Sequence, residues 1–260
     1  MQSVVNTYQI LSHREIILND EKIFIITSNP SLTQELVFRA LQSRKFTSWL
    51  ETLNVSEFRL DVIEVRDVFL FGSIIGFICI NCKMFPRHIP EGEVARPVPG
   101  YVFIRGDAIV ILVIIKEKDT GKLYVVLTDQ YRLPFGNSII ELPAGMMDEE
   151  HNFKGQAALE LKEEAGIEIH PDDLHELIKF GPSLGGCDEK ITAFYCEIIR
   201  THEEIIEIQK EIYGEHEEGE IIHLRIEEFD INKILSLNKV HASGTLCALF
   251  AYQNLITKKL

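Results

Sequence analysis

The stretch LPAGMMDEEHNFKGQAALELKEEAGIEI, residues 142–169, combines a helix-forming run with a dense group of carboxylates. Residues 156–165 contain Ala, Leu, Glu and Lys but no Gly or Pro, which predicts a helix. Gly166 follows where a helix C-terminus favours a residue that tolerates positive φ. The apolar residues that recur every four positions and predict the packed face are Ala157, Leu161 and Ala165.

Three glutamates lie close together on this predicted helix. Glu160 and Glu164 are four residues apart and face the same way, and Glu163 borders that face. Like charges at this spacing destabilise a helix unless something offsets them, and carboxylate oxygens suit Mg²⁺ or Mn²⁺. From the helix alone, two interpretations stay open: a divalent-metal site and a solvated acidic helix face.

The spacing of the whole segment resembles the Nudix box. That family pattern is G, five residues, E, seven residues, then R-E-U-x-E-E-x-G-U, where U is bulky and apolar. The positions in register are Gly145, Glu160, Leu161, Glu163, Glu164, Gly166 and Ile167. Two positions depart, because His151 occupies the first Glu position and Leu159 the Arg position. The chain therefore resembles a Nudix hydrolase with an incomplete box, preceded by the segment LPAG.

The resemblance continues outside the box. Residues 100–106 (GYVFIRG), 127–132 (LTDQYR) and 185–189 (GGCDE) are similar to segments of the ADP-sugar diphosphatase branch, above all the plant-type ADP-glucose/ADP-ribose pyrophosphatases. The similarity covers roughly residues 23–256. It implies an α/β class fold, the Nudix α/β/α sandwich on a mixed sheet, and a homodimer whose N-terminal domains help to form the partner's substrate site.

The same resemblance assigns metal ligands and a base. The expected ligands of Mg²⁺ or Mn²⁺ are the Ala144 carbonyl, Glu160, Glu163 and Glu164, with Glu163 a ligand or the holder of the attacking water. The expected catalytic base is Glu217, in the loop of residues 214–220. Its acidic neighbours Glu215, Glu218 and Glu220 leave that choice open by one or two residues, and an acidic loop without a catalytic role is the alternative.

Four further residues match positions that contact substrate in the family. Arg132 matches an arginine that holds the phosphates, a task that suits a planar bidentate donor, although it could be a surface residue at a strand end. Glu189 matches a glutamate near the substrate, and Gly186 permits close backbone approach to a ligand, although turns use a Gly-Gly pair just as readily. Arg105 either orients the junction with the N-terminal region or touches ligand from the dimer partner.

Composition sets the remaining bounds. The chain has 260 residues, 46% of them hydrophobic, and a net charge of −14 that argues against a general nucleic-acid surface. No apolar run approaches the roughly 20 residues that span a membrane, and the first residues do not resemble a secretory signal. The five cysteines show no scaffold pattern, and the pair Cys79 and Cys82 lies in an apolar strand-like run, which favours unpaired thiols and a cytoplasmic protein.

We expect two domains with a boundary near residue 98. Residues 1–98 form a smaller N-terminal α+β domain, which contributes to dimerisation and to the substrate site, and residues 99–260 form the Nudix hydrolase domain. Expected helices span residues 35–44, with Ser31 or Thr33 as cap, 46–53, 156–165, 228–235 and 241–254. Expected strands span residues 23–27, 58–82 (two strands), 102–115 (one or two), 123–128, 174–180, 191–199 and 221–226, whereas residues 139–142 lead into the box and residues 203–213 have no clear pattern.

The expected reaction is the metal-dependent hydrolysis of the pyrophosphate bond of an ADP-sugar, ADP-ribose or ADP-glucose, to AMP and a sugar phosphate. Without the box arginine at Leu159 and the acid at His151, we expect a slower but active hydrolase. Two alternatives remain: a Nudix hydrolase of another nucleotide-sugar or dinucleotide, and a catalytically impaired sensor that binds a nucleotide-sugar. The sequence does not identify the sugar.

Overall fold

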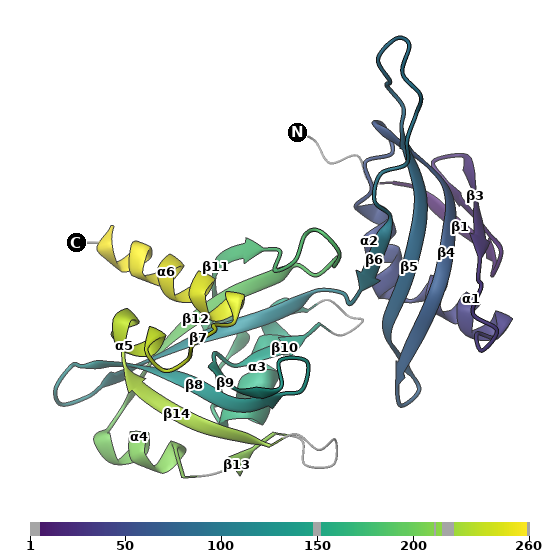
Figure 1. Cartoon of the computed structure of the whole chain (residues 1–260). Helices are drawn as coiled ribbons and strands as arrows, with labels where there is room; N and C mark the ends of the chain where they lie inside the picture. The colour runs from purple at the N-terminus through teal and green to yellow at the C-terminus, as the bar shows by residue number, and fades with distance from the viewer. Residues whose placement is uncertain (1–5, 148–151, 211, 215–220, 259–260) are drawn as a thin grey trace. The chain divides into compact units, whose positions relative to one another are not determined.

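The computed structural model of the chain divides into two compact units (Figure 1). The residues it describes are 6–147, 152–210, 212–214 and 221–258. The first unit comprises Met1–Asp107 together with Ser183–Glu189, and the second comprises Ala108–Pro182 and Lys190–Leu260.

The first unit is built on a sheet of strand order β1-β2-β3-β4-β5-β6. The strands are β1 (Tyr8–Ser12), β2 (Glu15–Leu18), β3 (Glu21–Ile26), β4 (Phe58–Phe71), β5 (Ile74–Pro86) and β6 (Tyr101–Ile104). Strands β3 and β4 are parallel and the other neighbours antiparallel, so this sheet is mixed. The parallel pair requires a crossover, which the two helices of this unit provide.

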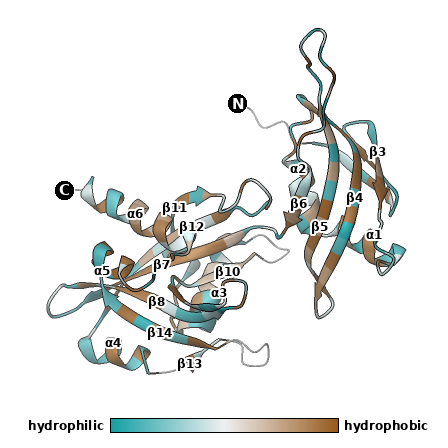
Figure 2. Cartoon of the chain, viewed as in Figure 1, coloured by the Kyte–Doolittle hydropathy of each residue, from teal (hydrophilic) through white to brown (hydrophobic). Residues whose placement is uncertain are grey.

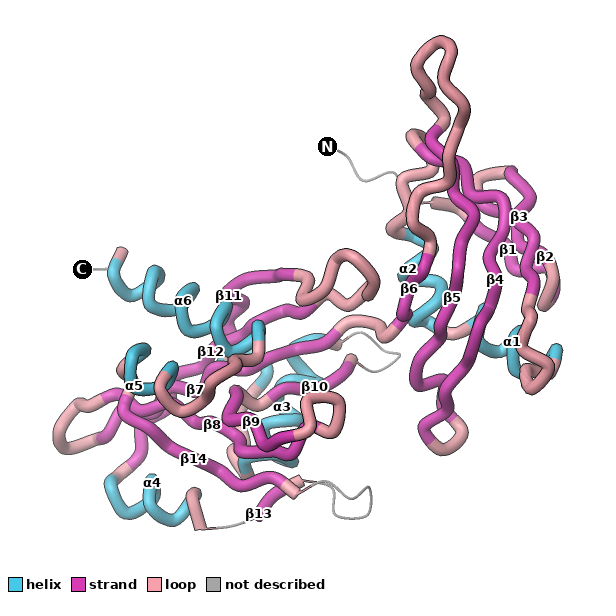
Figure 3. Tube along the Cα trace, viewed as in Figure 1, coloured by secondary structure: helices cyan, strands magenta, loops and turns pink. Residues whose placement is uncertain are grey.

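Helices α1 (Gln34–Gln42) and α2 (Arg44–Glu51) lie in this crossover (Figure 3). The Thr33 side chain caps α1 by accepting from the Leu36 N–H, which confirms one of the two expected caps. The side chain of Ser43, between the helices, caps α2 by accepting from the Phe46 N–H. Buried helix residues pack against the sheet in one core that includes Val37, Leu41, Phe46, Trp49, Leu50, Ile63, Ile78 and Ile80.

Two features of this unit differ from the sequence expectation. Strands β1 and β2 were not expected; Asn19 and Asp20, which have φ of 45° and 63°, make the turn from β2 to β3 and are the residue types that tolerate such angles. Strand β6 pairs antiparallel with β5, so the compact unit extends to Asp107 and not to residue 98.

The second unit contains a larger mixed sheet of order β11-β12-β7-β8-β14-β13, with β10 paired to β7 and β9 to β8. Its strands are β7 (Ala108–Glu117), β8 (Leu123–Arg132), β9 (Asn137–Glu141), β10 (Ala144–Met146), β11 (His175–Phe180), β12 (Ile191–Arg200), β13 (Ile212–Tyr213) and β14 (Ile222–Glu228). Strands β7 and β12 are parallel, and the other described pairs are antiparallel. The expected mixed sheet is therefore confirmed.

Both faces of strand β7 are buried, which is why its sequence is apolar almost throughout (Figure 2). Side chains on one face, among them Ile109, Ile111, Val113 and Ile115, share a core with Ala157 and Leu161 of the box helix. Side chains on the other face, among them Val110, Leu112 and Ile114, share a second core with Ala248, Leu249 and Tyr252. These two cores make the unit an α/β/α sandwich.

The helices of the second unit are α3 (Phe153–Ala165), α4 (His202–Ile208), α5 (Ile231–Leu235) and α6 (Ser243–Thr257), with a short 3₁₀ turn, η1, at Pro171–Asp173. Through Ile205, α4 joins the core of α3, and through Ile234, α5 joins the core of α6. Helix α4 lies where no clear pattern was expected. A capping box between Thr201 and Glu204 marks its start and was the available sequence signal. None of the described helices is long and apolar enough to span a membrane.

Candidate functional site

The box helix α3 ends as its sequence predicts. Gly166 is its C-cap with φ of 62°, in the left-handed region, and its N–H bonds to the Lys162 carbonyl at 3.1 Å. Ala157 and Leu161 are fully buried against the sheet and fix the rotation of the helix. Leu159, which stands at the position of the box arginine, is 46% exposed and takes no part in that core.

Strand β10 holds the start of the box beside this helix. Its pairing with β7 fixes Ala144 and Gly145 in register with the sheet. The Ala144 N–H donates to Oε2 of Glu164 at 3.0 Å, and Glu164 is only 4% exposed. A Cβ on Gly145 would lie 1.8 Å from Oε1 of Glu160, so that carboxylate rests directly against the glycine. The fold thus brings the expected ligands Ala144, Glu160 and Glu164 together.

The donor set that meets here consists of oxygen atoms. The Glu160 carboxylate also accepts from Nε2 of Gln156 at 2.9 Å. Glu163 is half-buried, next to Glu164 on the same helix. The described residues contain no group of three or more His, Cys, Asp or Glu side chains that could hold a metal ion. Two carboxylates, a main-chain carbonyl and water nevertheless fit the oxygen chemistry of Mg²⁺ or Mn²⁺, which retain several waters in proteins.

The segment that leads into the expected base loop is attached to the end of α3. The Gly214 N–H donates to the Glu163 carbonyl at 3.3 Å. The Tyr213 ring packs against Gly166, since a Cβ added to this glycine would lie 2.6 Å from Cε1 of Tyr213. After the loop, Ile222 pairs with Gln130 of β8. The expected base Glu217 and its acidic neighbours lie outside the described residues, as does His151.

Arg132 is the last residue of β8 and is held by a glutamate. Its Nε donates to Oε1 of Glu141 at 2.6 Å; the Arg132 side chain is 40% exposed and that of Glu141 11% exposed. Glu141 was not among the residues predicted from the sequence. An acid is unusual at a nearly buried position, but its burial is visible only in the structure.

The loop of residues 183–189 belongs to the first unit, although the sequence analysis placed it in the hydrolase domain. Phe103 and Gly186 are joined by a backbone hydrogen bond of 2.8 Å. Oδ1 of Asp188 accepts from the N–H groups of Arg105 and Gly106, at 2.7 and 3.2 Å. Asp188 was quoted in the motif but given no role; it fastens the bend at residues 105–107.

Arg105 and Glu189 form an ion pair in this loop, with Nε and Oε1 3.0 Å apart. The guanidinium also lies over the Phe77 ring, 5.9 Å from its centroid. Burial raises the pKa of Glu189, and the charge of Arg105 acts in the opposite direction. Burial also raises the pKa of Asp188, although its two backbone hydrogen bonds oppose the shift. These contacts hold the Arg105 side chain within its own unit, and its role stays a prediction.

The backbone angles and the packing of this loop would both allow a residue other than glycine at its two glycine positions. Gly185 and Gly186 do not have positive φ, and a Cβ on either would meet no atom within 4 Å. The space beside them is compatible with the close approach of a ligand, and that role of Gly186 stays a prediction.

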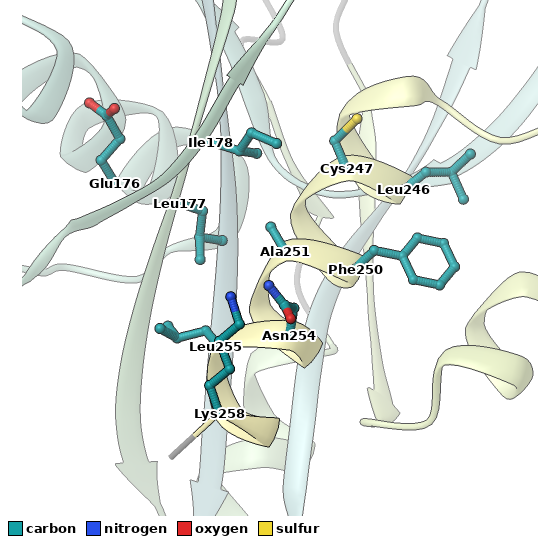
Figure 4. A pocket seen from close by; sticks show the side chains of 10 residues that line it. All are labelled: Glu176, Leu177, Ile178, Leu246, Cys247, Phe250, Ala251, Asn254, Leu255 and Lys258. Atoms are coloured by element: carbon teal, nitrogen blue, oxygen red, sulfur yellow. The ribbon is translucent and has the colours of Figure 1, made fainter.

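The apolar groove between β11 and α6 is separate from the predicted site residues (Figure 4). Its volume is about 730 Å³. Side chains that line it include Leu177, Ile178, Leu246, Phe250 and Leu255. None of the expected catalytic, metal or substrate residues lines this groove.

The cysteine pair on β5 is structural, as expected. Cys82 is buried, and burial raises the pKa of its thiol to about 12, which makes it a poor nucleophile and metal ligand. Cys79 lies three residues earlier, so the two side chains point to opposite faces of the strand. All five cysteines are free thiols.

Comparison with known proteins shows what the chain is similar to in fold and in sequence. The fold resembles a solved structure described as "Crystal structure of ADP compounds hydrolase", with a TM-score of 0.52 and 12% identity, over 78% of this chain and 96% of that one. No protein-family model matches the chain. The chain is 34% identical over 204 residues to Nudix hydrolase 14, chloroplastic, of Arabidopsis thaliana, which covers 72% of this chain and 64% of that protein.

The chain is therefore a homologue of this Nudix hydrolase, in line with the resemblance of its box. It spans a little under two thirds of the Arabidopsis protein. A shorter segment of 56 residues is 45% identical to putative nudix hydrolase 2 of Caenorhabditis elegans and covers 22% of this chain and 25% of that protein. A segment of 72 residues is 38% identical to the methanol dehydrogenase activator of Bacillus methanolicus and covers 28% of this chain and 38% of that protein.

Proposed function

We propose that the protein hydrolyses the pyrophosphate bond of an ADP-sugar, ADP-ribose or ADP-glucose, to AMP and a sugar phosphate with the help of Mg²⁺ or Mn²⁺. The observation that carries the proposal is the meeting of Ala144 and Gly145 with the carboxylates of Glu164 and Glu160. A solvated acidic helix face would leave these side chains pointing into water, whereas Glu164 is buried.

In this proposal the metal ion is held by the Ala144 carbonyl, Glu160, Glu164 and Glu163. When bound, such an ion neutralises phosphate charge and lowers the pKa of a coordinated water. The Ala144 N–H orients Glu164 by its hydrogen bond, and Gln156 orients Glu160 in the same way. These two contacts set the carboxylates before any ligand arrives.

The remaining roles are assigned to the chain's own donors and acceptors. Arg132 has an exposed guanidinium and holds the diphosphate, and Glu217 removes a proton from the attacking water. The attachment of Gly214 to the Glu163 carbonyl supports this base, because it starts the loop at the box helix. The substrate contacts expected of Arg105, Gly186 and Glu189, which belong to the first unit, stay predictions.

The partner expected beyond the substrate is a second copy of the chain, bound through the first unit. Exposed apolar side chains at the turn between β4 and β5 support this homodimer: Phe69, Leu70, Phe71 and Ile74, each at least 42% exposed. The cytoplasmic location stays a prediction; the Arabidopsis relative is named as chloroplastic.

A second candidate function, a sensor that binds a nucleotide-sugar without turnover, is favoured by one observation. The box arginine is replaced by Leu159, whose side chain is 46% exposed and carries no charge with which to orient Glu163. The site then binds its ligands with the carboxylates less well placed. A third candidate, a Nudix hydrolase of another nucleotide-sugar or a dinucleotide, differs only in the substrate it selects.

One assay separates these functions. The protein is incubated with ADP-ribose, ADP-glucose, diadenosine polyphosphates or NADH, with Mg²⁺ or Mn²⁺, and a coupled phosphatase reports released phosphate monoesters. Turnover of the ADP-sugars that is lost in Glu164→Gln and in Glu160→Gln supports the proposal. Turnover confined to the other substrates supports the third candidate. Metal-dependent thermal stabilisation without turnover of any substrate supports the sensor and refutes the hydrolase.

A further inference from the structure

The contact between Arg132 and Glu141 uses a particular nitrogen of the guanidinium. Glu141 binds Nε, and the terminal nitrogens of Arg132 make no hydrogen bond to any described residue. An arginine held through Nε keeps the outer edge of its planar fork for a bidentate acceptor such as a phosphate. The 40% exposure of the Arg132 side chain leaves that edge accessible.

Arg132 is also fixed at its backbone. Its carbonyl accepts from the N–H groups of Phe135 and Gly136, each at 2.9 Å, in the turn between β8 and β9. Backbone and side chain are therefore both anchored, which leaves the guanidinium little freedom. Such an arginine pays less rotamer entropy when it binds an anion than one that is free in solvent.

Glu141 belongs to a segment that is fastened residue by residue to the metal end of the site. The Leu142 N–H donates to Oγ1 of Thr245 at 3.1 Å, and the Pro143 carbonyl accepts from the Ile111 N–H at 2.9 Å. Ala144 then bonds to Glu164. A carboxylate three residues before Ala144 therefore ties the arginine to the segment that carries the expected metal ligand.

We infer that Glu141 is a positioning residue that holds the guanidinium of Arg132 so that its terminal nitrogens receive the diphosphate of the substrate. The inference rests on the proposed function. It goes beyond that proposal because it assigns phosphate affinity to a residue that touches neither the metal nor the substrate.

The second unit contains a similar pair for the control. Nε of Arg225 lies 2.7 Å from Oε1 of Glu227, with side chains 43% and 13% exposed, against 2.6 Å, 40% and 11% for Arg132 and Glu141. Oε2 of Glu227 also pairs with Nζ of Lys233 at 2.9 Å, so if the Glu141 pair served stability alone, Glu227→Ala would weaken ADP binding at least as much as Glu141→Ala. A specific effect on ligand affinity at Glu141 therefore separates positioning from structural support.

The experiment is a calorimetric titration of ADP, with Mg²⁺ present, into the wild type, Glu141→Ala, Glu141→Gln and Glu227→Ala proteins. We expect Glu141→Ala to weaken ADP binding at least tenfold and Glu227→Ala to change it less than twofold. Glu141→Gln keeps an oxygen acceptor for Nε and should recover most of the affinity. The melting temperature of each of the four proteins is measured to verify that it is folded at the temperature of the titration.

Equal or tighter ADP binding by Glu141→Ala overturns the inference, since loss of a negative charge near Arg132 would then have been the dominant effect. Equal losses in Glu141→Ala and Glu227→Ala overturn it as well, as does a wild type that binds no ADP. Turnover of ADP-ribose is measured separately: for Glu141→Ala we expect KM to rise more than kcat falls. A wild type without turnover refutes the proposed function, while the ADP titration still decides the role of Glu141.

Discussion

Substitution of Gly145 by Ala tests the contact on which the metal site depends. The added Cβ would lie 1.8 Å from Oε1 and 2.0 Å from Cδ of Glu160. Gly145 does not have a positive φ, so alanine can adopt its backbone conformation and the perturbation acts through the side chain alone. To restore an ordinary separation of 3.4 Å, the Glu160 oxygen must retreat by about 1.6 Å.

That displacement is large on the scale of metal coordination. Ligand distances in a working site vary by about 0.2 Å, and a misplacement of about 1 Å in an active site costs on the order of 100-fold in rate. We therefore expect Gly145→Ala to lower kcat/KM for the ADP-sugar at least about 100-fold, which is about 2.7 kcal/mol of transition-state stabilisation. The concentration of Mg²⁺ that gives half-maximal rate should rise in parallel.

The assays are steady-state hydrolysis over a Mg²⁺ series and the thermal shift that Mg²⁺ or Mn²⁺ produces. The control is Gly244→Ala in α6, where the new Cβ meets Val110 at 3.4 Å, an ordinary contact, and activity should not change. In a Glu160→Ala background, Gly145→Ala should have little further effect because the clashing carboxylate is gone. Wild-type metal dependence in Gly145→Ala would refute the reasoning, as would equal losses in both backgrounds.

Three further predictions concern the remaining special residues. Asp188→Ala should lower the free energy of unfolding by about 1–3 kcal/mol in urea, because two backbone N–H groups lose their acceptor, whereas Asp188→Asn retains an acceptor and should cost less. Burial raises the folded pKa of Asp188 above its unfolded value, so the folded state holds the proton more tightly and wild-type stability falls as pH rises through that window. The stability of Asp188→Asn relative to wild type should therefore increase from pH about 4 upward; a constant difference between pH about 3.5 and 7 would contradict this. Leu159→Arg replaces a 46% exposed side chain, should change stability by less than about 0.5 kcal/mol, and should raise kcat by pairing with Glu163 four residues on; an unchanged kcat would show that Leu159 does not slow the enzyme. Gly100→Ala would place a Cβ 2.0 Å from the Cys82 carbonyl oxygen and should destabilise the protein by about 1–3 kcal/mol, and a wild-type urea midpoint would show that the backbone adjusts freely.

Local sequence rules predicted the parts of the site that lie within one element. The helix period predicted that Glu160 and Glu164 share a face, and the αL preference of glycine predicted the end of α3 at Gly166. The mostly apolar residues 102–115 predicted one or two strands, and most of β7 lies within that range. These features depend on neighbours a few residues away, so the sequence contains all that is needed to infer them.

Contacts between elements were not predicted by local rules. The Arg132–Glu141 pair depends on the register of two strands across a turn, and neither residue alone indicates its partner. Strands β1 and β2 have five and four residues, too few for an alternating pattern to stand out, so their pairing with each other and with β3 is what reveals them. The loop of residues 183–189 joined the first unit because Asp188 fastens it to residues 105 and 106, over 80 positions away.

From the sequence by itself, helix spacing predicted the shared face of Glu160 and Glu164 and the end of α3, because these are local properties, and the resemblance of the box to the Nudix pattern implied the α/β/α sandwich. Only the tertiary structure decided that the Ala144 N–H binds a buried Glu164, that Gly145 leaves room for the Glu160 carboxylate, and that Glu141 holds Arg132. The physical reason is that these contacts form between elements brought together by strand pairing and core packing, and their geometry is fixed only when the sheet and the helix are in place.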